Sequence, residues 1–295
     1  MSMPVLTDRA TGRGSPVADG PDPGPAVPVT SARRRYRRAL GLVVPVLLVV
    51  GWAVASGQGW LAERLLPAPG VVARSGLDFF FGQRRTTLAG VVPFDGAGWS
   101  HVGASLFRCL VSFALAVVVG VAAGLALGLS RWVADLLDPL LNGLRAVPLY
   151  AWLPISLIWF GLGEGAARAL IFIGALWPVL IATADAVARV PGAHIETARM
   201  LGTPRHRLWR RVYLPSALPE IVTGLRLSLT LAWMCVIVGE LTGTSTGVGA
   251  MMNAARETGR TEQIVVGMVV FAVVGFAADL VLRLLTRRWV RWADT

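Results

Sequence analysis

The chain has 295 residues, of which 55% are hydrophobic and 15% are charged, and its mean hydropathy is +0.62. Soluble domains carry about 25% charged residues, so this composition excludes an ordinary soluble protein and indicates several membrane-spanning helices. Every one of the 28 residues counted as lysine or arginine is arginine. A lysine-dependent phosphate-binding loop and a lysine Schiff base are therefore excluded on this chain.

The net charge of +11 does not indicate a nucleic-acid-binding protein, although basic patches attract phosphate. The arginines gather at the ends of apolar segments, where a membrane protein places them. Cys109 and Cys235 each lie inside an apolar run, so each is interpreted as a small buried hydrophobe. His101, His194 and His206 lack the spacing of zinc ligands, and no metal site is expected.

The first 32 residues are rich in proline, glycine and small polar residues, and they predict a disordered cytoplasmic N-terminus. An arginine-rich stretch, Arg33–Arg38, then precedes an apolar run at 39–55. This pattern predicts a first transmembrane helix within 33–60. Residues 61–100 mix Phe79, Phe80 and Phe81 with prolines and charges, and they are interpreted as a periplasmic loop that contains an interfacial helix.

Five more apolar runs are each long enough to cross a hydrocarbon layer of about 30 Å. They lie at 103–129, 136–160, 166–187, 217–241 and 263–286. The predicted fold is therefore an all-α integral membrane protein with about six transmembrane helices and a core domain at 101–292. The run at 136–160 contains Pro139, Pro148 and Pro154, so we expect it to be kinked or broken and to border a pathway rather than lipid alone.

Glycines recur every four residues in the run at 103–129, at Gly120, Gly124 and Gly128. Such a ridge allows close helix contact, but glycine is also common in membrane helices for no such reason, and the sequence does not separate the two readings. The segment Leu241–Ala250 is too polar to face lipid, so we expect it to border water or protein.

Arginines near the predicted span ends are distributed unequally between the two sides of the membrane. With the N-terminus inside, sixteen lie on the cytoplasmic side and seven on the other. The positive-inside rule therefore predicts a multi-pass protein of the bacterial cytoplasmic membrane with both termini in the cytoplasm.

The cytoplasmic loop at 190–215 shows an ordered local pattern. Glu196–Leu201 is a good helix former, and Gly202 can supply the left-handed residue that ends such a helix. Thr203 is a suitable N-cap for a second helix and Pro204 suits its first turn. Pro215 is expected to break the pattern before the next span.

The second helix of this loop is amphipathic. Its apolar stripe consists of Leu208, Trp209 and Val212, and arginines occupy the remaining positions. One interpretation is a segment that lies on anionic lipid.

The spacing within the loop favours a different interpretation. Glu196-Thr197-Ala198, followed at fixed distances by Gly202, Val212 and Leu214-Pro215, resembles the E-A-A…G…I-x-L-P loop of ATP-binding-cassette importer permeases. Thr197 replaces the usual alanine and Val212 the usual isoleucine. Further matching stretches are Ser105–Arg108, Gly128–Trp132, Leu136–Arg145, Ile158–Gly163, Leu214–Pro219, Gly224–Leu229 and the segment around Asp279, Leu280 and Arg283. The resemblance covers about His101 to Trp292, and it is to the branch that serves nitrate, aliphatic sulfonates, taurine and some pyrimidine precursors.

The resemblance implies a type I importer permease fold and a transport subunit without chemistry of its own. It implies an ATPase-docking element made of Glu196, Thr197, Ala198, Gly202, Thr203, Pro204, Leu208, Val212, Leu214 and Pro215. The implied partners are two copies of a cytoplasmic ATPase, which would bind ATP and Mg²⁺, a second copy of this chain, and a periplasmic or lipid-anchored solute-binding protein. The solute would be a small anion such as an aliphatic sulfonate, taurine or nitrate, with a pyrimidine or thiamine precursor as the alternative.

Charged residues inside spans are expensive and usually face the bundle interior. The candidate pathway residues are Arg226, Arg108, Trp152 and Glu240. For both arginines, a buried salt bridge to another helix is the competing interpretation. Asp279 and Arg283 are four residues apart and are expected to pair.

Arg145 is expected either to lie in the pathway or to extend towards the membrane interface.

Two other classes of function remain open. Asp185, His194, Glu196 and His206 could serve a membrane enzyme that acts on lipid head groups, although their spacing matches no catalytic motif. A channel or secondary transporter would leave the loop at 190–215 unexplained, and the sequence shows no convincing repeat of the kind many such transporters contain.

Overall fold

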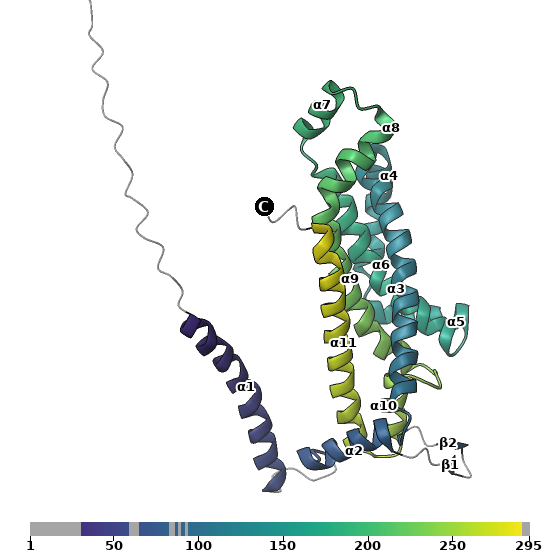
Figure 1. Ribbon diagram of the computed structural model, residues 1–295. Helices are drawn as coiled ribbons and strands as arrows, with labels where there is room; N and C mark the ends of the chain where they lie inside the picture. The colour runs from purple at the N-terminus through teal and green to yellow at the C-terminus, as the bar shows by residue number, and fades with distance from the viewer. Residues whose placement is uncertain (1–30, 59–64, 83–85, 88–89, 92–93, 291–295) are drawn as a thin grey trace, which may run out of the picture. The chain divides into compact units, whose positions relative to one another are not determined.

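The computed structural model describes residues 31–58, 65–82, 86–87, 90–91 and 94–290 (Figure 1). It divides into two units, 1–51 and 52–295, each of which is described by itself. The prediction of disorder at 1–32 falls almost entirely outside the described residues.

The described part of the chain is almost entirely helical. Its elements up to the first long bundle helix are α1 (Ser31–Gly57), α2 (Pro69–Phe81), β1 (Thr86–Thr87), β2 (Gly90–Val91) and α3 (Gly98–Leu129). The elements that follow are α4 (Arg131–Ala146), the 3₁₀ turn η1 (Leu149–Trp152), α5 (Leu153–Phe160), α6 (Glu164–Ala188), α7 (Gly192–Met200), α8 (Arg205–Leu208), the π turn η2 (Trp209–Tyr213), α9 (Leu214–Glu240), α10 (Val248–Glu257) and α11 (Thr261–Val290). The two short strands pair antiparallel, with Thr86 opposite Val91 and Thr87 opposite Gly90.

Four helical segments of the described residues are long and apolar enough to cross a membrane. They are Gly98–Leu129, Glu164–Ala188, Trp209–Glu240 and Thr261–Arg287. They confirm four of the predicted spans to within a few residues at most of their ends. Two starts differ more: α3 begins five residues before the predicted 103–129, and the segment Trp209–Glu240 includes the π turn η2 ahead of α9. α1, the predicted first span, contributes a shorter apolar stretch, Val46–Gly57.

The remaining predicted span, 136–160, is broken as expected. Trp132–Ala146 and Leu149–Phe160 meet at an angle of 94°, and together they are long and apolar enough to cross a membrane as one interrupted span. The break lies at Val147, whose φ of −70° and ψ of 120° are extended, because the ring of the following Pro148 disfavours a helical conformation there. Pro139, in contrast, lies within α4.

The core of the bundle is a row of three helices in which α6 packs between α3 and α9. The glycine ridge of α3 faces α6, where a Cβ at Gly120 would lie 3.1 Å from Val179, and a Cβ at Gly124 would lie 2.6 Å from Thr183. At Gly128 it would lie 2.7 Å from Val187. The ridge is therefore a contact surface, and the reading of these glycines as incidental is wrong.

The α6–α9 interface is equally close. Ser228 of α9 donates its hydroxyl to the carbonyl oxygen of Ala175 at 2.6 Å, and a Cβ at Gly239 would lie 3.0 Å from Ala167. Cys109 and Cys235 are both free and buried in an apolar cluster shared by α3, α6 and α9, which confirms their interpretation as small hydrophobes. A second apolar cluster joins α2, α10 and α11 and includes Phe79.

Candidate functional site

One end of the bundle carries α7 and α8, the two short helices of the predicted docking element (Figure 1). Gly202 follows α7 with a φ of +77°, the left-handed conformation that the sequence predicts. Its N–H donates to the carbonyl oxygen of Arg199 at 2.9 Å, and the N–H of Thr203 donates to the carbonyl oxygen of Ala198 at 3.0 Å. These two bonds close the helix end and turn the chain sharply.

The start of the second helix differs from the prediction. The N-cap is Pro204, with extended φ −67° and ψ 149°, and α8 begins at Arg205. Thr203 lies one residue before the N-cap, because Pro204 is still extended and helical backbone begins only at Arg205. The side chains of Arg205 and His206 lie outside the described part of the structure.

The prediction that Pro215 breaks the helix is also wrong. The π turn η2 precedes it, and the N–H of Leu214 donates to the carbonyl of Trp209, five residues back. A proline in a helix interior removes a hydrogen bond and crowds the preceding turn. Pro215 instead lies in the first turn of α9, directly after the wider π turn, and the helix runs from Trp209 to Glu240 as one segment.

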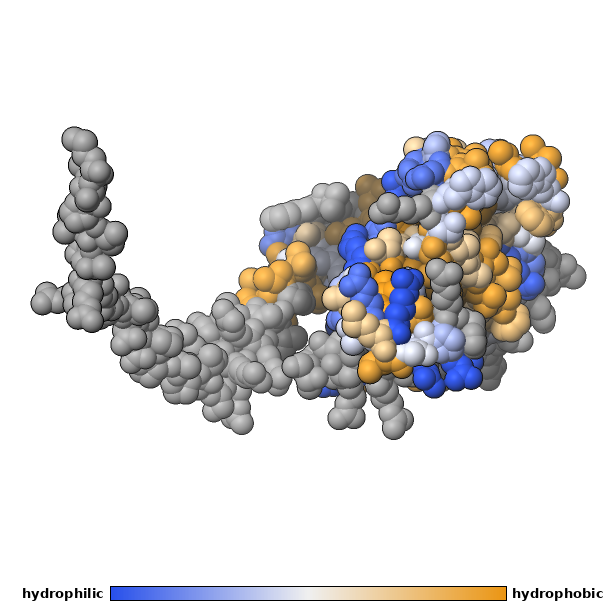
Figure 2. Space-filling view, turned by 90° about the horizontal axis from the view of Figure 1, so that it is seen from above, coloured by the Kyte–Doolittle hydropathy of each residue, from blue (hydrophilic) through white to orange (hydrophobic). Residues whose placement is uncertain are grey.

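The tip of this element is exposed and partly apolar. Met200 is 86% and Leu201 80% exposed, whereas Leu208 of α8 is buried, with 4% exposed. Glu196 and Thr197 are exposed on α7. Seen from this end, hydrophilic and hydrophobic residues are interspersed (Figure 2). Large exposed apolar side chains on a polar loop mark a contact surface.

The remaining members of the docking set lie closer to the bundle. Ala198, Val212, Leu214 and Pro215 are half-buried. Trp209 is 41% exposed, with the Arg210 guanidinium 5.7 Å from its ring centre. The predicted apolar stripe is therefore divided between a buried anchor, Leu208, and a tryptophan at the surface.

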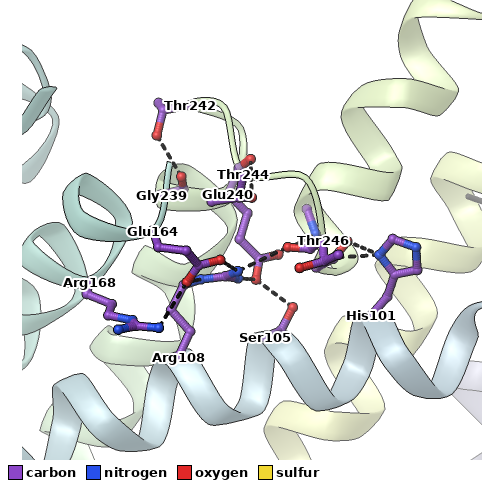
Figure 3. Close-up of polar contacts among 12 residues, drawn as sticks. His101, Ser105, Arg108, Glu164, Arg168, Gly239, Glu240, Thr242, Thr244 and Thr246 are labelled. Carbon is purple, nitrogen blue, oxygen red and sulfur yellow. Dashed lines mark hydrogen bonds and ion pairs between the residues drawn. The ribbon is translucent and has the colours of Figure 1, made fainter. Parts of the chain in front are cut away.

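The opposite end of the bundle contains a buried ionic cluster (Figure 3). Arg108 of α3 pairs with Glu240, the last residue of α9, and with Glu164, the first residue of α6. Its Nε donates to Glu164 at 3.0 Å, and its guanidinium also donates to the carbonyl oxygen of Thr246 at 3.1 Å. Arg108 and Glu240 are each 1% exposed. The cluster therefore joins three core helices, and water is excluded from its Arg108–Glu240 pair.

The same cluster fixes the loop between α9 and α10. Glu240 accepts hydrogen bonds from the Ser105 hydroxyl at 2.6 Å and from the Gly249 N–H at 2.7 Å. The Ser105 oxygen in turn accepts from the Val248 N–H at 2.9 Å, and His101 Nδ1 lies within hydrogen-bonding distance of the Gly247 backbone. The predicted polar segment Leu241–Ala250 therefore borders protein at its buried end, Gly247–Gly249.

The four predicted pathway residues do not converge on one place. Arg108 and Glu240 meet in the buried ionic cluster, which is the competing interpretation that the sequence leaves open for Arg108. Arg226 lies on α9 and forms no ion pair with another described residue, and its buried Nε has no hydrogen-bond partner. Trp152 lies at the end of η1, beside a hollow that Arg145 also lines.

Sequence reasoning missed Glu164 and Ser105 as members of the ionic cluster. Glu164 carries a local signal, since it starts a helix and pairs with Arg168 four residues later at 3.3 Å. Ser105 lies three residues before Arg108 on the same helix face, but nothing local links Glu164 to Arg108, or either residue to Glu240. The predicted pair of Asp279 and Arg283 is confirmed, with a distance of 2.9 Å.

The residues named for a membrane enzyme are not assembled into a site. Asp185 pairs with Arg189 at 3.2 Å, and Arg189 also pairs with Glu220 at 2.7 Å. His194 and Glu196 are exposed on α7. No hydrogen bond or ion pair joins any two of the four enzyme candidates in the described part of the chain, from which the His206 side chain is missing.

The geometry agrees with comparisons to known proteins. Residues 116–291 match the family model of the binding-protein-dependent transport system inner membrane component. The chain is 37% identical to the taurine transport system permease protein TauC of Escherichia coli, over 84% of this chain and 86% of that protein. It is 31% identical to the nitrate import permease protein NrtB of Synechocystis, over 81% and 84% of the two chains.

A solved structure shares the fold. It is an inward-facing conformation of the MetNI methionine ABC transporter, with a TM-score of 0.52, 22% identity, and coverage of 64% of this chain and 96% of that one. With four long apolar helices and a broken fifth segment, the chain is a multi-pass membrane protein of the type I permease fold. It belongs to the family of binding-protein-dependent transport system inner membrane components, the permeases of ATP-binding-cassette importers.

Proposed function

We propose that this chain is the permease subunit of an importer that moves a small anionic solute into the cytoplasm. The similarity to a taurine permease and a nitrate permease supports this solute class, because both solutes carry a compact, oxygen-rich anionic group. A pyrimidine or thiamine precursor is the alternative solute.

The observation that carries the proposal is the exposed element at 192–215 and its connection to the bundle. Its left-handed Gly202 presents the apolar tip, Met200 and Leu201, away from the membrane helices. Its second half runs through η2 into α9 without interruption. A partner that grips the tip therefore acts directly on a core helix, as a rigid-body switch between two states of a transporter requires.

The partner is a separate ATPase, bound in two copies, which supplies the ATP and Mg²⁺ chemistry. The missing lysine supports this division of labour, because this chain cannot build the lysine-containing phosphate loop. A second copy of this chain completes the membrane part, since most oligomers of identical chains are twofold symmetric. A periplasmic or lipid-anchored binding protein delivers the solute.

The arginine bias supports an orientation with both termini in the cytoplasm. The α7–α8 end then faces the ATPase. The ionic cluster lies at the opposite, periplasmic end, where the binding protein delivers solute.

The test is affinity purification of the chain from native membranes, with mass spectrometry of its stoichiometric partners. Wild type should recover an ATPase subunit, and Gly202→Val should lose most of it, because a β-branched residue at a φ of +77° is strained. Gly202→Asn should retain the ATPase, since asparagine tolerates this conformation.

Gly192→Val is the matched control. Gly192 starts α7, lacks a positive φ, and has no atom near the position of an added Cβ. Recovery of wild-type chain alone, under conditions that keep other importers intact, would contradict the proposal. Equal ATPase loss from Gly192→Val and Gly202→Val would show that ATPase binding does not depend on the left-handed turn at Gly202.

A further inference from the structure

The geometry points to a solute-binding site at the break between α4 and η1, in which Arg145 contacts the anionic group and Trp152 and Trp177 form the walls. This inference rests on the proposed function, because it assumes an anionic solute. The residue that contacts the anion is thus Arg145, and not Arg108 or Arg226, the two arginines that the sequence suggests for the pathway.

The break creates the space. A hollow of about 410 Å³ lies where the chain turns by 94° at Val147-Pro148, and it is also lined by residues of α6 and α9. Irregular backbone at membrane depth is tolerated where it is buried in protein or lines a water-filled cavity. Interrupted helices of this kind form solute sites in other transporters.

Arg145 supplies a positive charge that the protein does not use internally. It is exposed in the last turn of α4, and within the described residues it has neither an ion-pair partner nor a hydrogen bond from its side chain. By contrast, Arg108, Arg168, Arg189 and Arg283 all pair with carboxylates. Because the Arg145 charge is accessible in the hollow and no carboxylate of the described residues neutralises it, an anionic solute in the hollow would pair with it.

A second hollow adjoins the first and is lined by carboxylates as well as by Arg145. It has a volume of about 270 Å³ and shares Arg145, Trp177 and Ile181 with the first, so the two adjoin. Its lining includes the carboxylates Asp138 and Asp185. Asp185 is neutralised by its 3.2 Å ion pair with Arg189, and Asp138 has no ion-pair partner among the described residues. An anion is therefore attracted to Arg145 and repelled by Asp138 in the second hollow, which favours a resting position in the first.

The other arginines are less suited to this role. Arg108 is enclosed by two carboxylates and a backbone carbonyl. Arg226 lines neither of the two hollows. Arg145 is the arginine that lines both.

The experiment uses a cysteine reporter beside Arg145. Val147 is 39% exposed and lines the hollow, so Val147→Cys, in a background with Cys109→Ala and Cys235→Ala, reacts with small thiol reagents in membrane vesicles. The reagents are 2-sulfonatoethyl methanethiosulfonate, which carries a sulfonate, and its trimethylammonioethyl counterpart of opposite charge. The measured quantity is the ratio of the two reaction rates.

Arg145→Gln should lower the anion-to-cation ratio about tenfold, because one unit charge in a hydrated hollow changes each rate about threefold in opposite directions. Arg145→Lys should restore the ratio. Arg226→Gln should leave it unchanged. The ratio at Ser245→Cys, an exposed position in the loop after α9, should not respond to Arg145→Gln.

An unchanged ratio at Val147→Cys on Arg145→Gln would overturn the inference, as would an equal drop on Arg226→Gln. Each variant is first checked for recovery of the ATPase subunit, so a folding defect is seen separately. Because Arg145 is exposed and unpaired, Arg145→Gln is expected to assemble normally.

Transport separates this inference from the proposed function. Vesicles containing the complete importer are assayed with taurine and with nitrate, and Arg145→Gln should raise the KM about tenfold or more, the effect of losing one charge-assisted contact. If wild type moves neither solute, the proposed anionic class fails, whatever the reagent ratio. If wild type imports either solute and Arg145→Gln has the same KM, the site fails and the function stands.

Discussion

Replacing Arg108 by glutamine tests how much the buried ionic cluster stabilises the bundle. The substitution removes the ion pairs to Glu240 and Glu164 and the bond to the Thr246 carbonyl. Glu240, 1% exposed, keeps only the hydrogen bonds from Ser105 and Gly249. Leaving one partner of a buried pair uncompensated costs about 3–5 kcal/mol.

Glu164→Gln is the matched control. The Glu164 side chain is 47% exposed, so its ion pair with Arg108 is screened by solvent, and Arg108 keeps Glu240 after the substitution. Partly exposed pairs contribute about 0–1 kcal/mol. Arg108→Gln should therefore destabilise the protein by roughly 3 kcal/mol more than Glu164→Gln.

The chain supplies its own reporter for the assay. Cys109 and Cys235 are free and 1% exposed, so a dye that fluoresces on reaction with a thiol reports unfolding during heating in detergent. Arg108→Gln should lower the midpoint by on the order of 10 °C and Glu164→Gln by at most a few degrees. Equal small shifts for the two variants would show that the cluster does not stabilise the bundle and would refute the reasoning.

Two further predictions use the same dye assay. Gly124→Ala should destabilise the protein by about 1–3 kcal/mol, because its Cβ would lie 2.6 Å from the Cβ of Thr183. Gly103→Ala, on the same helix but with no atom near its Cβ, should be neutral or stabilising. Equal effects of the two substitutions would contradict the close contact at Gly124. Trp233→Phe should cost about 1 kcal/mol by removing the 3.0 Å hydrogen bond from its indole N–H to the Phe271 carbonyl, and an unchanged midpoint would show that this bond is not stabilising.

The spans and the turn at Gly202 could be predicted from sequence because each depends on neighbouring residues. Apolar runs give the helices, and a glycine after a good helix former gives the left-handed residue. The glycine ridge could be recognised but not interpreted, because its meaning depends on α6 lying against it. Only the structure, through the contact of Gly124 with Thr183, distinguishes a contact surface from incidental glycine.

The errors arose where a helix boundary depends on backbone conformation that residue type alone does not fix. Thr203 suits an N-cap by type, but Pro204 after it is still extended, so the helix begins one residue later than predicted. Pro215 is a helix breaker by type, but the π turn before it lets the helix continue. The ionic cluster could not be predicted because Arg108 and Glu240 are 132 residues apart and share no local pattern.

The uninterrupted helix from Trp209 to Glu240 makes the two ends of the molecule mechanically dependent. Its 32 residues span about 48 Å at 1.5 Å per residue. It behaves as a lever, so a tilt of about 5° at the η2 end displaces the Glu240 end by about 4 Å. Glu240 cannot move that far and keep both Arg108 and the Gly249 N–H. A movement that tilts the η2 end would therefore strain the cluster at the other end through one helix, without a relay of side chains.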